Sequence, residues 1–347
     1  MAVDWTLVFP IIVGASITFQ GAASALMGKN GGTFYSTFAV FGTGLIPAII
    51  HWLAATNGGT SVDYHTGFST AAWYSYLGGF CGPSFVMSII FLAPKIGAGT
   101  FFVTSVSAQL TSALVFQNWG WISLPQHTAS SGAIAGLCVI LLSVAIIGSA
   151  KPATPAVEAE GEHSVTVIGE EKIVDGSSDK AMEEGVEVVF KPSINILQYT
   201  LYLVIAAGAG ISGSLQAGMN SSLGVAFNSP PFCIFVVSLV TLVPVVPAYI
   251  VEYRKTPTDF RKVWLETPWW CWTTGIISYM VVAMFSYLPT HLDSAVLQAC
   301  LVTSQVILAI VADHFGWWGL NVNRITLQKA VGTVMLVAGV VVMSVFQ

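Results

Sequence analysis

Two parts of this chain repeat each other at a fixed spacing of 196 positions. At that spacing Gln20 aligns with Gln216 and Gln109 with Gln305. Glycines and a tryptophan follow the same register, with Gly14 aligned to Gly210, Gly28 to Gly224, Trp73 to Trp269, Gly79 to Gly275 and Gly136 to Gly332. Because the register holds without a gap through most of each part, the sequence indicates two copies of one structural unit.

A long polar segment, Lys151–Pro192, separates the two copies. It contains ten of the seventeen acidic residues, and the chain on either side of it is almost uniformly apolar. It is rich in Glu, Ala, Gly, Ser and Val, and we expect it to be mostly disordered, with short strands at Val165–Ile168 and Val186–Phe190 as the alternative. The sequence therefore predicts a first repeat over 1–149, an acidic and mostly disordered linker over 150–193, and a second repeat over 194–347.

The composition indicates a membrane protein. The chain has 347 residues, of which 54% are hydrophobic and 8% are charged, whereas soluble domains have about 25% charged residues. A membrane span needs about 20 predominantly apolar residues. Ten such runs occur, at about 5–27, 32–54, 71–93, 96–117, 131–149, 195–219, 230–251, 268–289, 292–313 and 327–346.

Each copy contains five of these runs, which is an odd number. If all five cross the membrane, the second copy enters from the opposite face, and the copies are related by an axis in the membrane plane. The predicted fold is therefore an all-α integral membrane protein with ten transmembrane helices, arranged as two inverted five-helix repeats.

The basic residues predict how these repeats face the membrane. With the linker in the cytoplasm, all twelve Lys and Arg residues fall in cytoplasmic segments, as the positive-inside rule requires. Arg324 and Lys329 align with Thr128 and Ala133, so each copy is basic only where its own orientation places a loop inside. We expect a multi-pass protein, most simply of the plasma membrane, with a cytoplasmic linker and both termini outside.

Several kinds of chemistry lack the residues they need. The sequence contains no G-x-x-x-x-G-K-[ST] phosphate loop and no H-E-x-x-H metal motif. The five cysteines lie in apolar runs without metal-ligand spacing, and no basic stripe with interleaved aromatic residues suggests nucleic-acid binding. We therefore expect no enzyme activity, no cofactor, no metal and no nucleic-acid partner.

Uncharged polar side chains do occur inside the predicted spans. Four glutamines, Gln20, Gln109, Gln216 and Gln305, are related in pairs by the repeat, and Asn220 lies one helical turn after Gln216. These five residues are candidate solute contacts around the repeat axis. The alternative is that they join helices by hydrogen bonds within the membrane, and both interpretations stay open here. The low charge within the spans favours a neutral, zwitterionic or delocalised-cation solute.

Two further features predict structural contacts. Asp313 and Arg324 flank the short loop between the ninth and tenth spans and are expected to form an ion pair at the inner face. The fifth and tenth spans carry few polar residues, and Gly132 and Gly136 form a G-x-x-x-G pattern that is typical of close helix packing. These two spans are candidates for a scaffold or a homodimer face exposed to lipid.

The second copy resembles a known transporter family. Gly210–Asn220 reads GISGSLQAGMN, Trp269–Trp270 opens the eighth span, Ser304–Gln305 lies in the ninth, and Asp313–Gly319 reads DHFGWWG ahead of Arg324 and Gly332. Together these motifs resemble the YdcZ-like branch of the drug/metabolite transporter superfamily, whose five-helix proteins occur singly, as pairs or fused. The resemblance covers roughly 1–149 and 193–347 and is closer in the second copy.

The resemblance implies inverted repeats around a central cavity and transport by alternating access. More familiar ten-helix members keep both termini in the cytoplasm, whereas the charges here place them outside. We accordingly expect a secondary transporter of a small organic metabolite or cation. The alternative from a different class is a non-transporting membrane scaffold or receptor that acts through the acidic linker.

Overall fold

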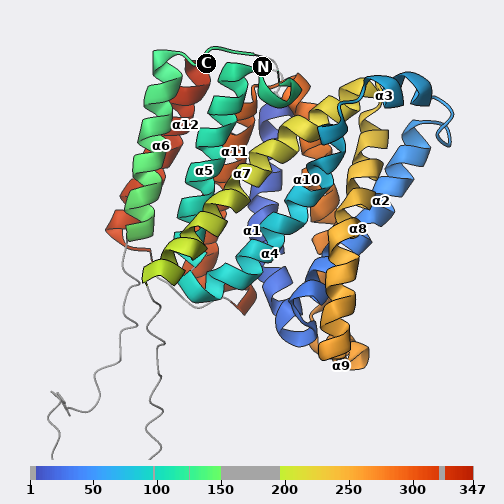
Figure 1. Ribbon diagram of the computed structural model, residues 1–347. Helices are drawn as coiled ribbons and strands as arrows, with labels where there is room; N and C mark the ends of the chain where they lie inside the picture. Colours follow the sequence, from blue (N-terminus) through green and yellow to red (C-terminus); the bar gives the residue numbers. More distant parts are fainter. Residues whose placement is uncertain (1–4, 97, 125, 150–195, 320–324, 347) are drawn as a thin grey trace, which may run out of the picture.

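The computed structural model describes residues 5–96, 98–124, 126–149, 196–319 and 325–346. The predicted linker and the loop residue Arg324 lie outside these ranges. Within the described residues the chain forms α-helices and short 3-10 helices, and no strand (Figure 1). Long apolar helices are the expected solution in lipid, because a helix satisfies its own backbone hydrogen bonds without water.

The helices occur in the same order in both copies. The first copy contains α1 (Trp5–Gly31), α2 (Thr33–Ala55), α3 (Tyr64–Thr70), η1 (Trp73–Leu77), α4 (Gly78–Ile96), α5 (Ala98–Trp119), η2 (Trp121–Ser123) and α6 (Ser131–Ser149). The second contains α7 (Ile196–Ala226), α8 (Pro230–Lys255), α9 (Phe260–Glu266), η3 (Trp269–Thr273), α10 (Thr274–Tyr287), η4 (Leu288–Thr290), α11 (Ser294–Phe315), η5 (Trp317–Gly319) and α12 (Leu327–Val345).

Helices occupy every range that the sequence predicted as a span, with η1 and η3 opening the third and the eighth. Among the described residues, eight helical segments are long and apolar enough to cross a membrane. The α6 helix is also apolar, over Ser131–Ile147, but is shorter. The large exposed side chains that surround the bundle include Trp73 and Trp269, which are 75% and 78% exposed. Such rings are typical of the membrane–water interface.

Two short helices, α3 and α9, were not expected from hydrophobic runs. They occupy equivalent positions in the two copies, and each is capped by an aspartate at its N-terminus. The Asp63 side chain accepts a hydrogen bond from the Thr66 N–H, and the Asp259 side chain accepts one from the Lys262 N–H, both at 3.0 Å. The repeat therefore extends into the loops, where capping replaces apolar periodicity as the local signal.

The main helix pairs join one copy to the other. The α1 helix packs mainly against α11, α5 against α7, α2 against α8, and α6 against α12. Figure 1 shows α6 and α12 side by side at one edge of the bundle, and α2 and α8 at the other. Because each α-helix finds its most extensive contact in the opposite copy, the two copies form one interleaved body.

Glycines allow these pairs to approach closely, and their contacts repeat at the 196-residue spacing. A Cβ added to Gly14 on α1 would overlap the Leu301 carbonyl oxygen of α11. A Cβ added to Gly210 on α7 would overlap the Ser105 carbonyl oxygen of α5 in the same way. Glycine also allows α6 to approach α12 closely, since a Cβ on Gly136 would lie 2.9 Å from the Gly339 carbonyl oxygen.

The chain enters and leaves the bundle in a regular way. In Figure 1, α1 begins and α12 ends at the upper end of the bundle, which we call the terminal face. The α6 helix ends and α7 begins at the opposite end, which we call the linker face. These two faces are the reference points for the site described next.

Candidate transport site

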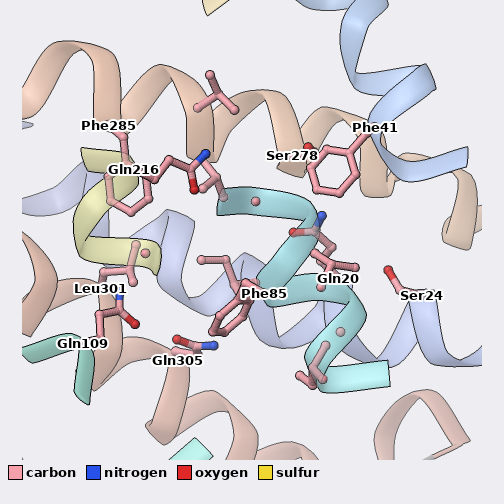
Figure 2. A pocket seen from close by; sticks show the side chains of 18 residues that line it. Gln20, Ser24, Phe41, Phe85, Gln109, Gln216, Ser278, Phe285, Leu301 and Gln305 are labelled. Carbon is pink, nitrogen blue, oxygen red and sulfur yellow. The ribbon is translucent and has the colours of Figure 1, made fainter. Parts of the chain in front are cut away.

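A pocket lies between the two copies, deep among the long helices. It contains about 730 Å³ of space that protein atoms do not fill, and this volume includes space open to the surroundings. The residues that line it come from α1, α2, α4, α5, α7, α10 and α11. Figure 2 shows the lining in close view, with both polar and aromatic side chains.

All four glutamines that the sequence singled out line this pocket: Gln20 on α1, Gln109 on α5, Gln216 on α7 and Gln305 on α11. In the view of Figure 2 they are distributed around the ring of Phe85. Each glutamine thus comes from a different helix, and the two pairs that the repeat relates are brought to one site.

Equivalent hydrogen bonds hold the two glutamine-bearing helix pairs. The Thr18 hydroxyl on α1 donates to the Gln305 carbonyl oxygen of α11 at 2.8 Å. The Ser214 hydroxyl on α7 donates to the Gln109 carbonyl oxygen of α5 at 2.6 Å. Both bonds reach across the copies at positions 196 apart, and they fix the backbone depth at which two of the amides enter the pocket.

The amide groups themselves have unequal partners. The Gln109 Nε2 group donates to the Gln298 Oε1 atom, and Gln298 Nε2 in turn lies 3.5 Å from the Gly213 carbonyl oxygen. Gln305 is 1% exposed, yet its Nε2 group has no hydrogen-bond partner among the described residues. Position 102, which is equivalent to Gln298, is a phenylalanine and cannot accept the corresponding bond.

The side-chain amides of Gln20 and Gln216 also have no hydrogen-bond partner in the described part of the chain, but unlike the Gln305 Nε2 group they are not fully buried. A fully buried amide without a partner, such as that of Gln305, loses the hydrogen bonds that it makes in water, at a cost of about 1–3 kcal/mol. Three of the four amides in this pocket are therefore available to a polar ligand.

Asn220, the fifth predicted contact, lies elsewhere. It is fully buried on α7, is not among the pocket-lining residues, and neither atom of its amide has a hydrogen-bond partner in the described structure. The start of α4 covers it, since a Cβ added to Gly78 would overlap the Asn220 Oδ1 atom. Its role as a solute contact stays a prediction.

Sequence reasoning did not select several residues that line the pocket. Three phenylalanines contribute apolar walls, Phe41, Phe85 and Phe285, and the hydroxyl side chains of Ser24 and Ser278 also face it. No Asp, Glu, Lys, Arg or His is among the lining residues within the described structure. The pocket therefore offers amides, hydroxyls and aromatic rings without a fixed charge.

The predicted ion pair between Asp313 and Arg324 falls outside what the structure describes, because Arg324 and the Asp313 side chain are not placed. A different pair lies toward the terminal face, where His127 Nε2 is 3.6 Å from Asp293 Oδ1 at the start of α11. A second pocket adjoins this pair, with Gln117 and His291 among its lining residues. No group of three His, Cys, Asp or Glu side chains among the described residues is placed to hold a metal.

Comparison with known families assigns the chain. A family model described as "Putative inner membrane exporter, YdcZ" matches residues 5–146 and 201–342. The two matched segments begin and end 196 positions apart, as the repeat does, and together they cover well over half of the chain. The chain belongs to the YdcZ family of the drug/metabolite transporter superfamily. No curated protein matches it.

The membership confirms the resemblance, and the matched residues lie in both copies. A YdcZ protein in the fused, two-copy form is an integral membrane transporter. The amide-lined pocket of this YdcZ chain thus lies inside a protein whose family moves small molecules through membranes.

Proposed function

We propose that this YdcZ protein is a secondary transporter that binds a small organic metabolite or cation in the amide-lined pocket and moves it by alternating access. The observation that carries the proposal is the pocket itself, which lies between the copies and contains three amides without a protein partner. Amides that served only to join helices would be paired with one another, as Gln109 and Gln298 are.

Inverted repeats give this pocket a way to open to either side. The paired contacts at 196-residue spacing support ten spans in two inverted sets, because they relate α1–α11 to α5–α7 by a twofold axis through the pocket. In such a fold, a tilt of one set relative to the other opens one face as it closes the opposite face. Two conformations of similar energy then exchange a solute without a large rearrangement of the core.

The solute that fits the lining is uncharged, zwitterionic or a cation with delocalised charge. An anion such as a phosphate would require basic side chains, and the described lining has none. The rings of Phe41, Phe85 and Phe285 accept flat apolar surface and can face a delocalised cation. Gln20, Gln216 and Gln305 then supply directional hydrogen bonds, each with one donor and one acceptor group.

We also propose that the linker face lies in the cytoplasm and that both termini lie outside. Every Lys and Arg of the described residues lies in a segment at the linker face, including the ends of α1, α4 and α8, the α9 helix and the start of α12. A protease-cleavable tag after Gln347 is expected to be removed by external protease on intact cells, whereas a tag within 150–193 should survive. Protection of the C-terminal tag and loss of the linker tag would reverse the orientation.

Ligand binding tests the proposed site. Purified protein is screened for thermal stabilisation by amino acids, nucleosides, polyamines, vitamins and cationic dyes. A ligand at 100 times its dissociation constant stabilises the folded state by about 2.7 kcal/mol. For the ligand found, we expect Gln216→Leu to weaken binding by roughly tenfold, which corresponds to the loss of one buried hydrogen bond.

Gln198→Leu is the matched control for this test. Gln198 lies on the same helix as Gln216, but its amide donates to the Tyr202 hydroxyl at 2.7 Å, and it is not a pocket-lining residue. Binding should be unchanged in this variant. Equal weakening by both substitutions, or binding that neither affects, would place the ligand outside the pocket and contradict the proposal.

A further inference from the structure

The pocket is more symmetric at its centre than toward the linker face. Most lining residues occur as equivalents in the two copies, namely 17 and 213, 20 and 216, 82 and 278, 85 and 281, 86 and 282, 89 and 285, and 109 and 305. This central set lies around the axis that relates the copies, and it would remain in the lining whichever face the pocket opens to.

The remaining lining residues have no equivalent in the pocket. Gly21, Ser24 and Phe41 extend it along α1 and α2, toward the linker face where α1 ends. Their equivalents, Ala217, Asn220 and Val237, do not line the pocket. Leu301, from α11, is the other unmatched lining residue, and its equivalent Ser105 does not line the pocket either. The pocket thus has an arm toward the linker face, in which Ser24 is itself 0% exposed, and the corresponding region toward the terminal face, which is not part of the pocket, is here called the closed region.

Asn220 lies at the centre of that closed region. The η1–α4 junction covers it, because Gly78 lies directly against its Oδ1 atom and the Ser75 hydroxyl donates to the Ser222 hydroxyl at 2.9 Å. Both atoms of its amide are buried and have no hydrogen-bond partner among the described residues. Ser24, its equivalent, also has an unpartnered and buried hydroxyl, but Ser24 lines the arm of the pocket.

We infer that Asn220 becomes a solute-contacting residue in the opposite conformation, where the closed region opens toward the terminal face and the arm at Ser24 closes. This inference rests on the proposed alternating access, and it assigns the polar contacts of the two states to different residues. The solute meets the hydroxyl of Ser24 on the linker side and the amide of Asn220 on the terminal side. The central glutamines serve both states.

The opening requires a defined local movement. The η1–α4 junction moves away from α7, which separates Gly78 from Asn220 and breaks the hydrogen bond between Ser75 and Ser222. On the linker side, the equivalent pair is Cys271 and Leu26, which cannot form such a bond. The junction on the terminal side therefore has a hydrogen bond that the equivalent junction on the linker side lacks.

Cysteine accessibility tests the inference without a known solute. The five native cysteines are replaced by alanine, and S24C, N220C or S143C is introduced into that background. A charged methanethiosulfonate reagent, which does not cross membranes, is applied to either face in intact cells or inverted vesicles. Ser143 on α6 is as buried as Ser24 but lies outside the pocket, so S143C is the control that should not react from either face.

We expect S24C to react from the linker face at least tenfold faster than S143C, and N220C to react only from the terminal face. A tryptophan at position 24 should fill the open arm and favour the opposite conformation, so N220C should react at least threefold faster when combined with S24W. The combination of N220L with S24C tests the reverse effect. N220L replaces the unpartnered amide with an apolar side chain, favours the closed region, and should speed the reaction of S24C by at least threefold.

Two outcomes separate this inference from the proposed function. If S24C reacts from the linker face but N220C is inert with and without S24W, and N220L leaves S24C unchanged, Asn220 is a static buried residue and the inference is overturned. In that case the proposed transport pocket stands. If S24C reacts from neither face, the pocket does not open as described and both proposals fail.

Discussion

Gly210→Ala is expected to lower the midpoint of thermal unfolding by roughly 5–10 °C, because one added methyl group forces two helices apart. The Cβ would overlap the carbonyl oxygen of Ser105, which belongs to the α5 backbone and cannot rotate away. Relief requires α5 and α7 to separate along the interface that holds Gln109 and Gln216 at their depth. Unfolding of the purified protein, followed by intrinsic tryptophan fluorescence or by aggregation on heating, measures the effect.

Gly208→Ala is the matched control on the same helix. Nothing lies within 4 Å of a Cβ at position 208, so the change should be neutral or slightly stabilising, since alanine favours a helix over glycine. Gly14→Ala, at the position equivalent to Gly210, should reproduce the loss because its Cβ would overlap the Leu301 carbonyl oxygen. Similar midpoints for the alanine variants at 208 and 210 would contradict the close approach of α5 and α7.

Gln305→Leu is expected to reduce transport by roughly tenfold while it raises the free energy of unfolding by about 1 kcal/mol. The two effects have one cause, because the Nε2 group is buried without a protein partner and therefore costs stability until a solute binds it. Transport is measured as flux of the solute identified by binding, into vesicles that contain equal amounts of each variant. Thermal unfolding of the same preparations gives the change in stability.

Gln298→Leu provides the contrast. Gln298 accepts the hydrogen bond from Gln109 but does not line the pocket, so its removal leaves the Gln109 amide unpaired and should lower stability by about 1–3 kcal/mol. A structural glutamine and a solute-binding glutamine are thus distinguished by opposite signs of the stability change. If Gln305→Leu destabilises the protein as Gln298→Leu does, the Gln305 amide has a structural partner and not a ligand.

The helices could be predicted from sequence wherever lipid imposes a long apolar run, and their ends were less well defined. The α7 helix continues to Ala226, beyond the predicted end at 219, because small and polar residues such as Ser221 and Ser222 pack against protein there and not against lipid. The α3 and α9 helices, of seven residues each, contain too few turns to show a period. Their aspartate caps at the 196-residue spacing are a sequence signal that could have indicated them.

The repeat located the glutamines because a twofold axis brings equivalent residues to one depth. The same logic could not find Gln298, whose equivalent is Phe102, or the lining role of Phe41, whose equivalent Val237 is buried elsewhere. Gln298 differs from its equivalent in residue type, and Phe41 differs from its equivalent in whether it lines the pocket, so the repeat register predicts neither. The sequence repeat therefore predicted the central residues of the site and did not predict the residues of its arm.

The pairing of every main helix with one from the opposite copy also affects how the protein is made. The α1 helix enters the membrane early, but its partner α11 follows after most of the chain has been synthesised. At about 5–20 residues per second, the ribosome takes roughly 15–60 s to reach it. During that interval Gly14, Thr18 and Gln20 face lipid or another early helix, so the first copy must persist as inserted but unassembled helices until the second arrives.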